Sequence, residues 1–166
     1  MPPVTLDWHS ATREHRAHLS SFSCTLPDHG YFDEDEGFVC HDYPWELEVQ
    51  EFIRGMHPKV AAPDWLLVGY DDDGLAAVLA MRVSPFDRYA FIQAIGVAQR
   101  ASGNGLAGEA ITIAPQVMGT FYKMRSDFIV QARIDPMNFA AKSVAERAGF
   151  DHIGSDYTYE TWTKRY

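Results

Sequence analysis

The sequence predicts one mixed α/β domain covering residues 1–166, and three segments support this prediction. Residues 65–82 contain two apolar runs joined by Asp-Asp-Asp-Gly, which is typical of an antiparallel hairpin. Residues 91–108 form an apolar strand that leads through a glycine-rich turn into a helix. Residues 128–150 read as a further strand followed by a helix. With 46% apolar residues, the chain can bury one sizeable core.

Two helices are expected before the hairpin. The first begins near Ala11, and its buried side is marked by His15, Leu19 and Phe22. A loop over residues 25–43 follows. Pro44 suits the first turn of the second helix, and Asp42 lies close to its N-cap. The apolar face of this helix has helical spacing and consists of Trp45, Val49, Phe52, Ile53 and Met56.

The helix after the glycine turn extends from Leu106 toward Met124, with apolar residues at helical spacing. Pro115 lies well inside it and should kink or interrupt it. The last predicted strand contains three aromatic residues that alternate with polar ones, Tyr157, Tyr159 and Trp162. Such residues are more often involved in sheet packing or a dimer contact than in catalysis.

The glycine turn has two interpretations. Backbone N–H groups at a helix N-terminus bind phosphate, and residues 103–108 spell the dinucleotide pattern Gly-x-Gly-x-x-Gly. A dinucleotide fold places this turn in its first βαβ unit, before several parallel strands. Here the turn lies late in the chain and follows a hairpin. The dinucleotide interpretation is therefore disfavoured, and the alternative is the pyrophosphate of coenzyme A.

These residues resemble the GNAT superfamily of acyl-CoA-dependent N-acyltransferases, and the resemblance covers most of the chain. In that family a strand ending in valine precedes a turn of the form R/Q-x-x-G-x-G/A. Counting from Val97 places this motif on residues 102–107, with serine at its first position. A second register, residues 100–105, fits literally but is shifted by two. We favour the first, because it places Leu106 where the helix needs an apolar residue. Residues 138–150 resemble the family's N-x-x-A/S helix ending in Gly-Phe.

The resemblance implies a mostly antiparallel, splayed sheet with helices on both faces. It also implies direct transfer of an acetyl group from acetyl-CoA to an amine. The turn amides would hold the pyrophosphate, and the strand edge would pair with pantetheine. These contacts fall on Ile95, Gly96, Val97, Ser102, Gly103, Asn104, Gly105, Leu106 and Ala107. Asn138 would contact coenzyme A, a role compatible with capping its helix.

Two positions depart from the family's usual mechanism. The glutamate that often takes the amine proton is replaced by Gln93, and the tyrosine that protonates the thiolate is replaced by Ala145. A thiolate with a pKa of about 8.5 leaves with little help, so the second loss matters less. Freeing an alkyl amine with a pKa of about 10.4 costs about 4 kcal/mol at pH 7.

The sequence leaves the source of that free energy open. Gln93 could orient a chain of waters, or a weakly basic acceptor could need no base at all. A side chain of the acidic N-terminal segment could also take the proton, and its candidates are His29, Asp33, Glu34, His41 and Glu46. Holding the thioester and the amine together could supply about 7–11 kcal/mol of the barrier.

The net charge of −9 belongs to one segment. Residues 17–53 hold nine acidic residues and no Lys or Arg, and elsewhere fourteen acidic residues balance fourteen basic ones. In the GNAT fold this region walls the acceptor side of the cleft, so we expect a cationic acceptor to contact Asp33, Glu34, Asp35 and Glu36. The alternative is a solvated loop. A field of this sign repels nucleic acid.

Other binding classes are not expected. The His and Cys spacings match no zinc pattern, and the two cysteines make no disulfide scaffold. No apolar stretch reaches the length of a membrane span, and the N-terminus lacks a secretion signal, so we expect a cytoplasmic protein. Dimers are common in the family, but nothing in the sequence identifies an interface.

The predicted function is acetyl transfer to a primary amine of a small, cationic molecule. Two alternatives stay open. The acceptor could instead be a protein N-terminus or lysine. Gln93 and Ala145 would also suit a regulator that binds acyl-CoA without turnover.

Overall fold

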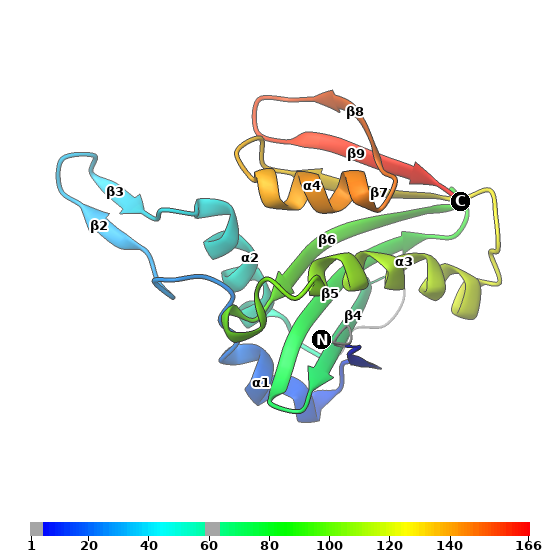
Figure 1. Cartoon of the computed structure of the whole chain (residues 1–166), viewed down its shortest axis with the longest axis horizontal. Helices are drawn as coiled ribbons and strands as arrows, with labels where there is room; N and C mark the ends of the chain where they lie inside the picture. The colour runs from blue at the N-terminus through cyan, green and yellow to red at the C-terminus, as the bar shows by residue number, and fades with distance from the viewer. Residues whose placement is uncertain (1–4, 59–63) are drawn as a thin grey trace.

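A seven-stranded sheet forms the centre of the computed structural model, which describes residues 5–58 and 64–166 (Figure 1). The strands lie in the order β1 (Asp7–Ser10), β4 (Asp64–Asp71), β5 (Gly74–Ser84), β6 (Tyr89–Val97), β7 (Ile129–Ile134), β9 (Glu160–Arg165) and β8 (Asp151–Ser155). All neighbouring pairs are antiparallel except β6 and β7, which are parallel. The mostly antiparallel sheet, with its hairpin at β4–β5, is confirmed.

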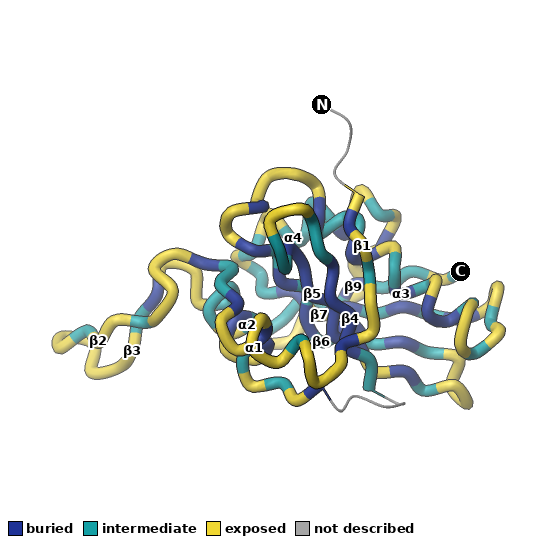
Figure 2. Tube along the Cα trace, turned by 90° about the horizontal axis from the view of Figure 1, so that it is seen from below, coloured by how far each residue is buried: buried dark blue, intermediate teal, exposed yellow. Residues whose placement is uncertain are grey.

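Helices cover both faces of this sheet, as predicted. They are α1 (Arg16–Ser20), α2 (Pro44–Gly55), α3 (Leu106–Tyr122) and α4 (Phe139–Arg147), with short 3-10 turns η1 (Arg13–His15) and η2 (Gln99–Ala101). On one face the sheet packs against Leu19 of α1 and Ile53 of α2. On the other it packs against Met118 of α3 and Ala145 of α4. Figure 2 shows the central strands buried between these layers.

The first two helices differ in detail from the prediction. The first begins at Arg13 as a 3-10 turn rather than near Ala11, and its α-helical part has only five residues. Leu19 is buried as expected, but His15 lies near the surface, where its Nδ1 accepts a hydrogen bond from the Thr12 N–H at 2.8 Å. The second helix does begin at Pro44. Its N-cap is Tyr43, so Asp42 lies next to the N-cap as predicted, and no side chain caps the helix.

The segment expected as a loop contains a second hairpin, β2 (Tyr31–Asp33) and β3 (Phe38–Cys40). Asp33 Oδ1 accepts the N–H groups of Asp35 and Glu36 at 2.9 and 3.2 Å, and Gly37 completes the turn with φ +74°. The four acidic residues therefore build the tip of this hairpin. Figures 1 and 2 show that the hairpin projects from the body of the molecule and is mostly exposed.

Pro115 was expected to kink or interrupt α3, and it does not interrupt the helix, which runs from Leu106 to Tyr122. Proline removes one backbone hydrogen bond from a helix interior. The neighbouring turns compensate, because Ile111, Ala114, Val117 and Met118 are all buried against the sheet. Tertiary packing therefore outweighs the local cost of the proline.

The last strand is shorter than predicted. Strand β9 begins at Glu160, so Trp162 packs in the sheet while Tyr157 and Tyr159 lie in the connection from β8. Within the described part of the chain, no helix has the length and apolar character needed to cross a membrane.

The sheet splits between β6 and β7. The two strands pair only from Tyr89–Ile129 to Ile92–Ala132, and Figure 1 shows them diverging beyond that point. The split coincides with a bulge in β6, because Met81 of β5 pairs with Ile92 and the next residue, Ala80, pairs with Ala94. Gln93 is therefore the extra residue. A bulge bends a strand and re-aims its side chains, so β6 turns away from β7 here.

Candidate active site

A cavity of about 440 Å³ fills the opening between the two diverging strands. Its walls come from α2, β6, α3, β7 and α4, with Tyr159 at the edge of β9. Most of the lining is apolar. The titratable side chains in the lining are Glu48, Arg133, Asp135 and Tyr159. A largely apolar cleft with a few polar groups is what small-molecule sites have in common.

Four of the predicted site residues line this cavity, namely Gln93, Ile95, Ala107 and Asn138. The side chain of Asn138 also caps α4, since its Oδ1 accepts the N–H of Ala141 at 3.0 Å. The capping role and a position in the cavity are thus compatible. Ile95 follows the bulge and packs partly against the α3 side of the core.

The glycine turn forms the N-terminal end of α3, next to Ala107. Gly103 and Gly105 have φ values of +82° and +77°, in the left-handed region that favours glycine. Gly105 is the N-cap of α3. The first N–H groups of a helix lack partners within it and carry its positive dipole end. Ser102, Gly103, Asn104 and Gly105 are exposed. The N–H of Ser102 donates to the carbonyl of Gln99 at 3.3 Å, so the turn offers the amides of Gly103, Asn104 and Gly105 to solvent.

Three other residues that were predicted to bind acetyl-CoA are involved in packing. Leu106 is buried in the core. Gly96 lies so close to α2 and the α1–α2 connection that an added Cβ would be 2.5 Å from Ile53 Cδ1 and 2.8 Å from Phe22 Cε1. Val97 packs against the same core. Only the backbone of these residues is suited to contact a ligand.

Arg100, the first residue of the alternative register, does not lie free beside the turn. Its guanidinium makes two hydrogen bonds to the Asp71 carboxylate at 2.8 and 2.9 Å and a third to the carbonyl of Leu75 at 3.1 Å. These bonds hold the pKa of Asp71 below its usual range. Arg100 thus links the segment before the glycine turn to the β4–β5 hairpin.

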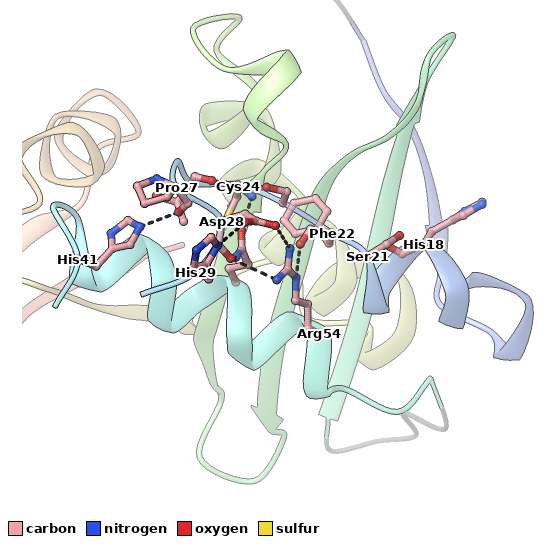
Figure 3. Close-up of polar contacts among 12 residues, drawn as sticks. His18, Ser21, Phe22, Cys24, Pro27, Asp28, His29, His41 and Arg54 are labelled. Carbon is pink, nitrogen blue, oxygen red and sulfur yellow. Dashed lines mark hydrogen bonds and ion pairs between the residues drawn. The ribbon is translucent and has the colours of Figure 1, made fainter. Parts of the chain in front are cut away.

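His41 does not line the cavity. Its Nδ1 accepts the N–H of Tyr43 at 2.8 Å, so Nε2 carries the proton and donates to the carbonyl of Pro27 at 2.8 Å (Figure 3). Both ring nitrogens are therefore occupied in holding the loop before α2. The acidic residues Asp33, Glu34, Asp35 and Glu36 do not line the cavity either.

A buried network holds the α1–α2 connection against α2. Gln50 is fully buried, and its amide accepts the N–H of Cys24 at 2.9 Å and donates to the carbonyl of Asp28 at 2.7 Å. Arg54 Nε donates to the carbonyl of Phe22 at 2.7 Å (Figure 3). Burial raises the pKa of the Cys24 thiol to about 12, so this cysteine is inert.

Sequence reasoning missed the most polar part of the cavity wall. Glu48 projects from α2, and Tyr159 reaches it from the other half of the sheet, donating its hydroxyl to the carboxylate oxygens at 3.1 and 3.3 Å. The guanidinium of Arg133 stacks 4.7 Å from the centre of the Tyr159 ring and also pairs with Asp156. Glu48 could have been noticed, since it lies three residues after Trp45 and one before Val49, on the apolar face of α2.

Among the described residues, no group of three or more His, Cys, Asp or Glu side chains is arranged to hold a metal ion. Comparison of the sequence with models of known families and with curated proteins gives no match.

Comparison with solved structures does give matches. A mutant of the spermidine N-acetyltransferase SpeG from Vibrio cholerae is 15% identical, with a TM-score of 0.66 over 96% of this chain and 93% of that chain. The PaiA N-acetyltransferase from Thermoplasma acidophilum, solved with coenzyme A, is 13% identical, with a TM-score of 0.68 over 98% and 99%. Nourseothricin acetyltransferase is 16% identical, with a TM-score of 0.64 over 96% and 98%.

The fold class is therefore that of the N-acetyltransferases, matched along nearly the whole chain. More specifically, the chain has the GNAT fold that its two motifs predicted. At identities of 13–16% the similarity establishes the fold alone.

Proposed function

We propose that this protein transfers an acetyl group from acetyl-CoA to a primary amine of a small, cationic molecule. The observation that carries the proposal is the cavity at the β6–β7 split. It lies beside the exposed amides of the glycine turn on one side and beside carboxylates on the other. The GNAT fold and the names of the structural neighbours support the same reaction.

The donor half of the proposal rests on the turn at residues 102–107. Its exposed amides, at the positive end of α3, are suited to the pyrophosphate of coenzyme A. Beyond Ile92 the edge of β6 no longer pairs with β7. The backbone from Gln93 to Val97 can then pair with pantetheine, and its N–H groups can polarise the thioester carbonyl.

The acceptor half rests on charge. Glu48 and Asp135 line the cavity, and the charge of Arg133, the cation in the lining, is offset by its pairing with Asp156. The aromatic rings of Trp45, Phe52 and Tyr159 lie in the same lining, and ring faces also attract cations. A neighbour named for spermidine, a molecule with several amines, is consistent with a cationic acceptor.

Release of free thiol from acetyl-CoA, measured with and without a panel of primary amines, tests the proposed reaction. We expect release that depends on the amine. Coenzyme A should also raise the melting temperature, because a ligand at 100 times its Kd stabilises the folded state by about 2.7 kcal/mol. Stabilisation without release under any amine would instead favour the acyl-CoA-binding regulator, to which Gln93 and Ala145 point.

Gly105→Glu should abolish the stabilisation by coenzyme A, because a carboxylate would stand among the phosphate-binding amides. Gly37→Glu is the matched control. Gly37 also has a positive φ and open space around it, but it lies at the tip of the β2–β3 hairpin. Both variants carry a similar backbone strain of about 1–2 kcal/mol. Stabilisation that survives in Gly105→Glu would overturn the assignment of the turn.

A further inference from the structure

The proposed reaction must remove a proton from the acceptor amine. Strand β6 offers no base for this step. Gln93 lies at the bulge, in the wall of the cavity, where its amide cannot take a proton. Any replacement must reach the same cavity. Among the described residues that line it, the only carboxylates are Glu48 and Asp135, and the lining includes no histidine or cysteine.

The candidates from the acidic segment have other roles. Both ring nitrogens of His41 are hydrogen-bonded. The carboxylate of Glu46 accepts the hydroxyl of buried Thr25 at 2.7 Å, and Asp33 closes the hairpin turn. Glu34, like Asp33, is in the hairpin and does not line the cavity. His29 does not line it either, and its Nδ1 pairs with Asp28 Oδ1 at 2.8 Å. None of these groups is placed to receive a proton from an amine in the cavity.

Asp135 is also less suited than Glu48. It directly follows β7, and its Oδ1 accepts the N–H of Met137 at 2.8 Å, which shapes the turn into α4. Glu48 makes no such backbone contact. Its carboxylate instead accepts the hydroxyl of Tyr159 at 3.1 Å, and Glu48 itself is exposed to solvent.

Tyr159 is held in place from several directions. The backbone N–H of Tyr159 and that of Thr158 both donate to Asp156 Oδ1 at 2.8 Å. Asp156 pairs with Arg133, whose guanidinium covers the Tyr159 ring. Burial and the neighbouring Glu48 raise the pKa of the Tyr159 hydroxyl, so the tyrosine remains a hydrogen-bond donor at neutral pH. The arrangement fixes the direction of the Glu48 carboxylate.

We propose that Glu48 binds the acceptor's ammonium group and takes its proton, and that Tyr159 is the positioning residue for this carboxylate. This inference rests on the proposed acetyl transfer. The ammonium gives one proton to Glu48, and the freed lone pair forms the N–C bond to the thioester carbonyl as the C–S bond breaks. The second nitrogen proton goes to the thiolate, which leaves as coenzyme A. Glu48, being exposed, returns its proton to water.

The test compares acceptors that differ in basicity. In Glu48→Gln, kcat/KM with an alkyl amine should fall by about 10²–10⁴-fold, the usual contribution of a general base. With an arylamine, which is already neutral at pH 7, the same variant should lose less than about tenfold, since no proton must be removed before attack. Glu51→Gln, an exposed carboxylate of the same helix outside the cavity, is the matched control and should behave as the wild type.

The same pair of acceptors tests Tyr159, whose hydroxyl contacts the Glu48 carboxylate at 3.1 Å. Tyr159→Phe should lower kcat with an alkyl amine by about 10–100-fold, the value of one hydrogen bond to a charged group. It should leave kcat with an arylamine unchanged, which a general loss of structure would not do.

The outcomes separate the inference from the proposed function. If the wild type releases no thiol with any amine, the acetyl transfer itself is wrong. If the wild type is active but Glu48→Gln loses both acceptors equally, or neither, the assignment of Glu48 is overturned. A selective loss of activity with the alkyl amine in Asp135→Asn rather than in Glu48→Gln would also overturn it. Acetyl-CoA should stabilise every variant as it does the wild type, which shows that each one folds.

Discussion

At the scale of single residues, Gly96 shows how closely β6 lies against the helical layer. Ile53 and Phe22, the two side chains that would meet an added Cβ, are both buried. Gly96→Ala should therefore destabilise the protein by about 1–3 kcal/mol, the usual cost of overpacking a core. Urea unfolding without ligand measures the change.

Gly108 is the matched control for this substitution. It lies in α3, and no atom comes within 4 Å of its added Cβ. Gly108→Ala should therefore stabilise the protein by up to about 1 kcal/mol through helix propensity. If both alanine variants changed the free energy of unfolding equally, the packing against Gly96 would be looser than the distances indicate.

Gln93 and Asn138, which the motifs located by counting along the chain, both line the cavity, and their roles there stay predictions. Sequence reasoning did not single out Glu48. The apolar stripe of α2 was predicted to be core, yet Ile53 is its one fully buried member, and Trp45, Val49 and Phe52 face the cavity. A helix that walls a cleft has the same periodicity as a helix that covers a core, so sequence alone cannot separate the two.

At the scale of elements, the Asp71–Arg100 pair joins the β4–β5 turn to the turn before α3. The Arg100 hydrogen bonds lower the pKa of Asp71 in the folded state. The stabilisation from this pair is therefore present above the usual pKa range of aspartate and is lost as the pH falls through the lowered value. Because both groups are partly exposed, we expect Asp71→Asn to cost at most about 1 kcal/mol at pH 7.

Urea unfolding of the wild type and Asp71→Asn at pH 7 and pH 2 measures this dependence. The difference between the two proteins should shrink toward zero at the lower pH. Asp72→Asn, an exposed position in the same turn, should match the wild type at both values. A difference for Asp71→Asn that is independent of pH would mean that its ionisation is not the cause.

Long elements were predicted well and short ones were not. The hairpin at 65–82, the strand at 91–97 and helix α3 were all clear from periodicity. Strands β2 and β3 have three residues each, which are too few positions to show a period of two. Pro115 does not interrupt α3, because its buried neighbours outweigh its local cost.

At the scale of the whole molecule, the uneven charge should affect the approach of substrates. Asp33, Glu34, Asp35 and Glu36 lie outside the cavity, so we propose that they act on a cationic acceptor through their field. The Debye length falls from about 30 Å at 10 mM salt to about 8 Å at 150 mM. The kcat/KM for a cationic acceptor should fall over this range, and that for a neutral arylamine should not.

Neutralising these four residues together, as Asn and Gln, isolates their part in that field. Asn at position 33 keeps an oxygen that can accept the turn's hydrogen bonds. The variant should show a flatter salt dependence with the cationic acceptor and an unchanged KM for acetyl-CoA. If the salt dependence of kcat/KM equals that of the wild type, the hairpin tip is only a solvated surface with no part in attracting the acceptor.

For the proposed acetyl transfer, the short pairing of β6 with β7 sets the stability of the fold against turnover. Four residue pairs join the two halves of the sheet, and the cavity exists because the ladder stops there. A substitution that lengthened the ladder would add hydrogen bonds and raise the melting temperature, while it narrowed the space for substrates. Selection for thermostability alone would therefore tend to close this split. A thermostable variant that keeps its activity must gain its stability elsewhere in the molecule.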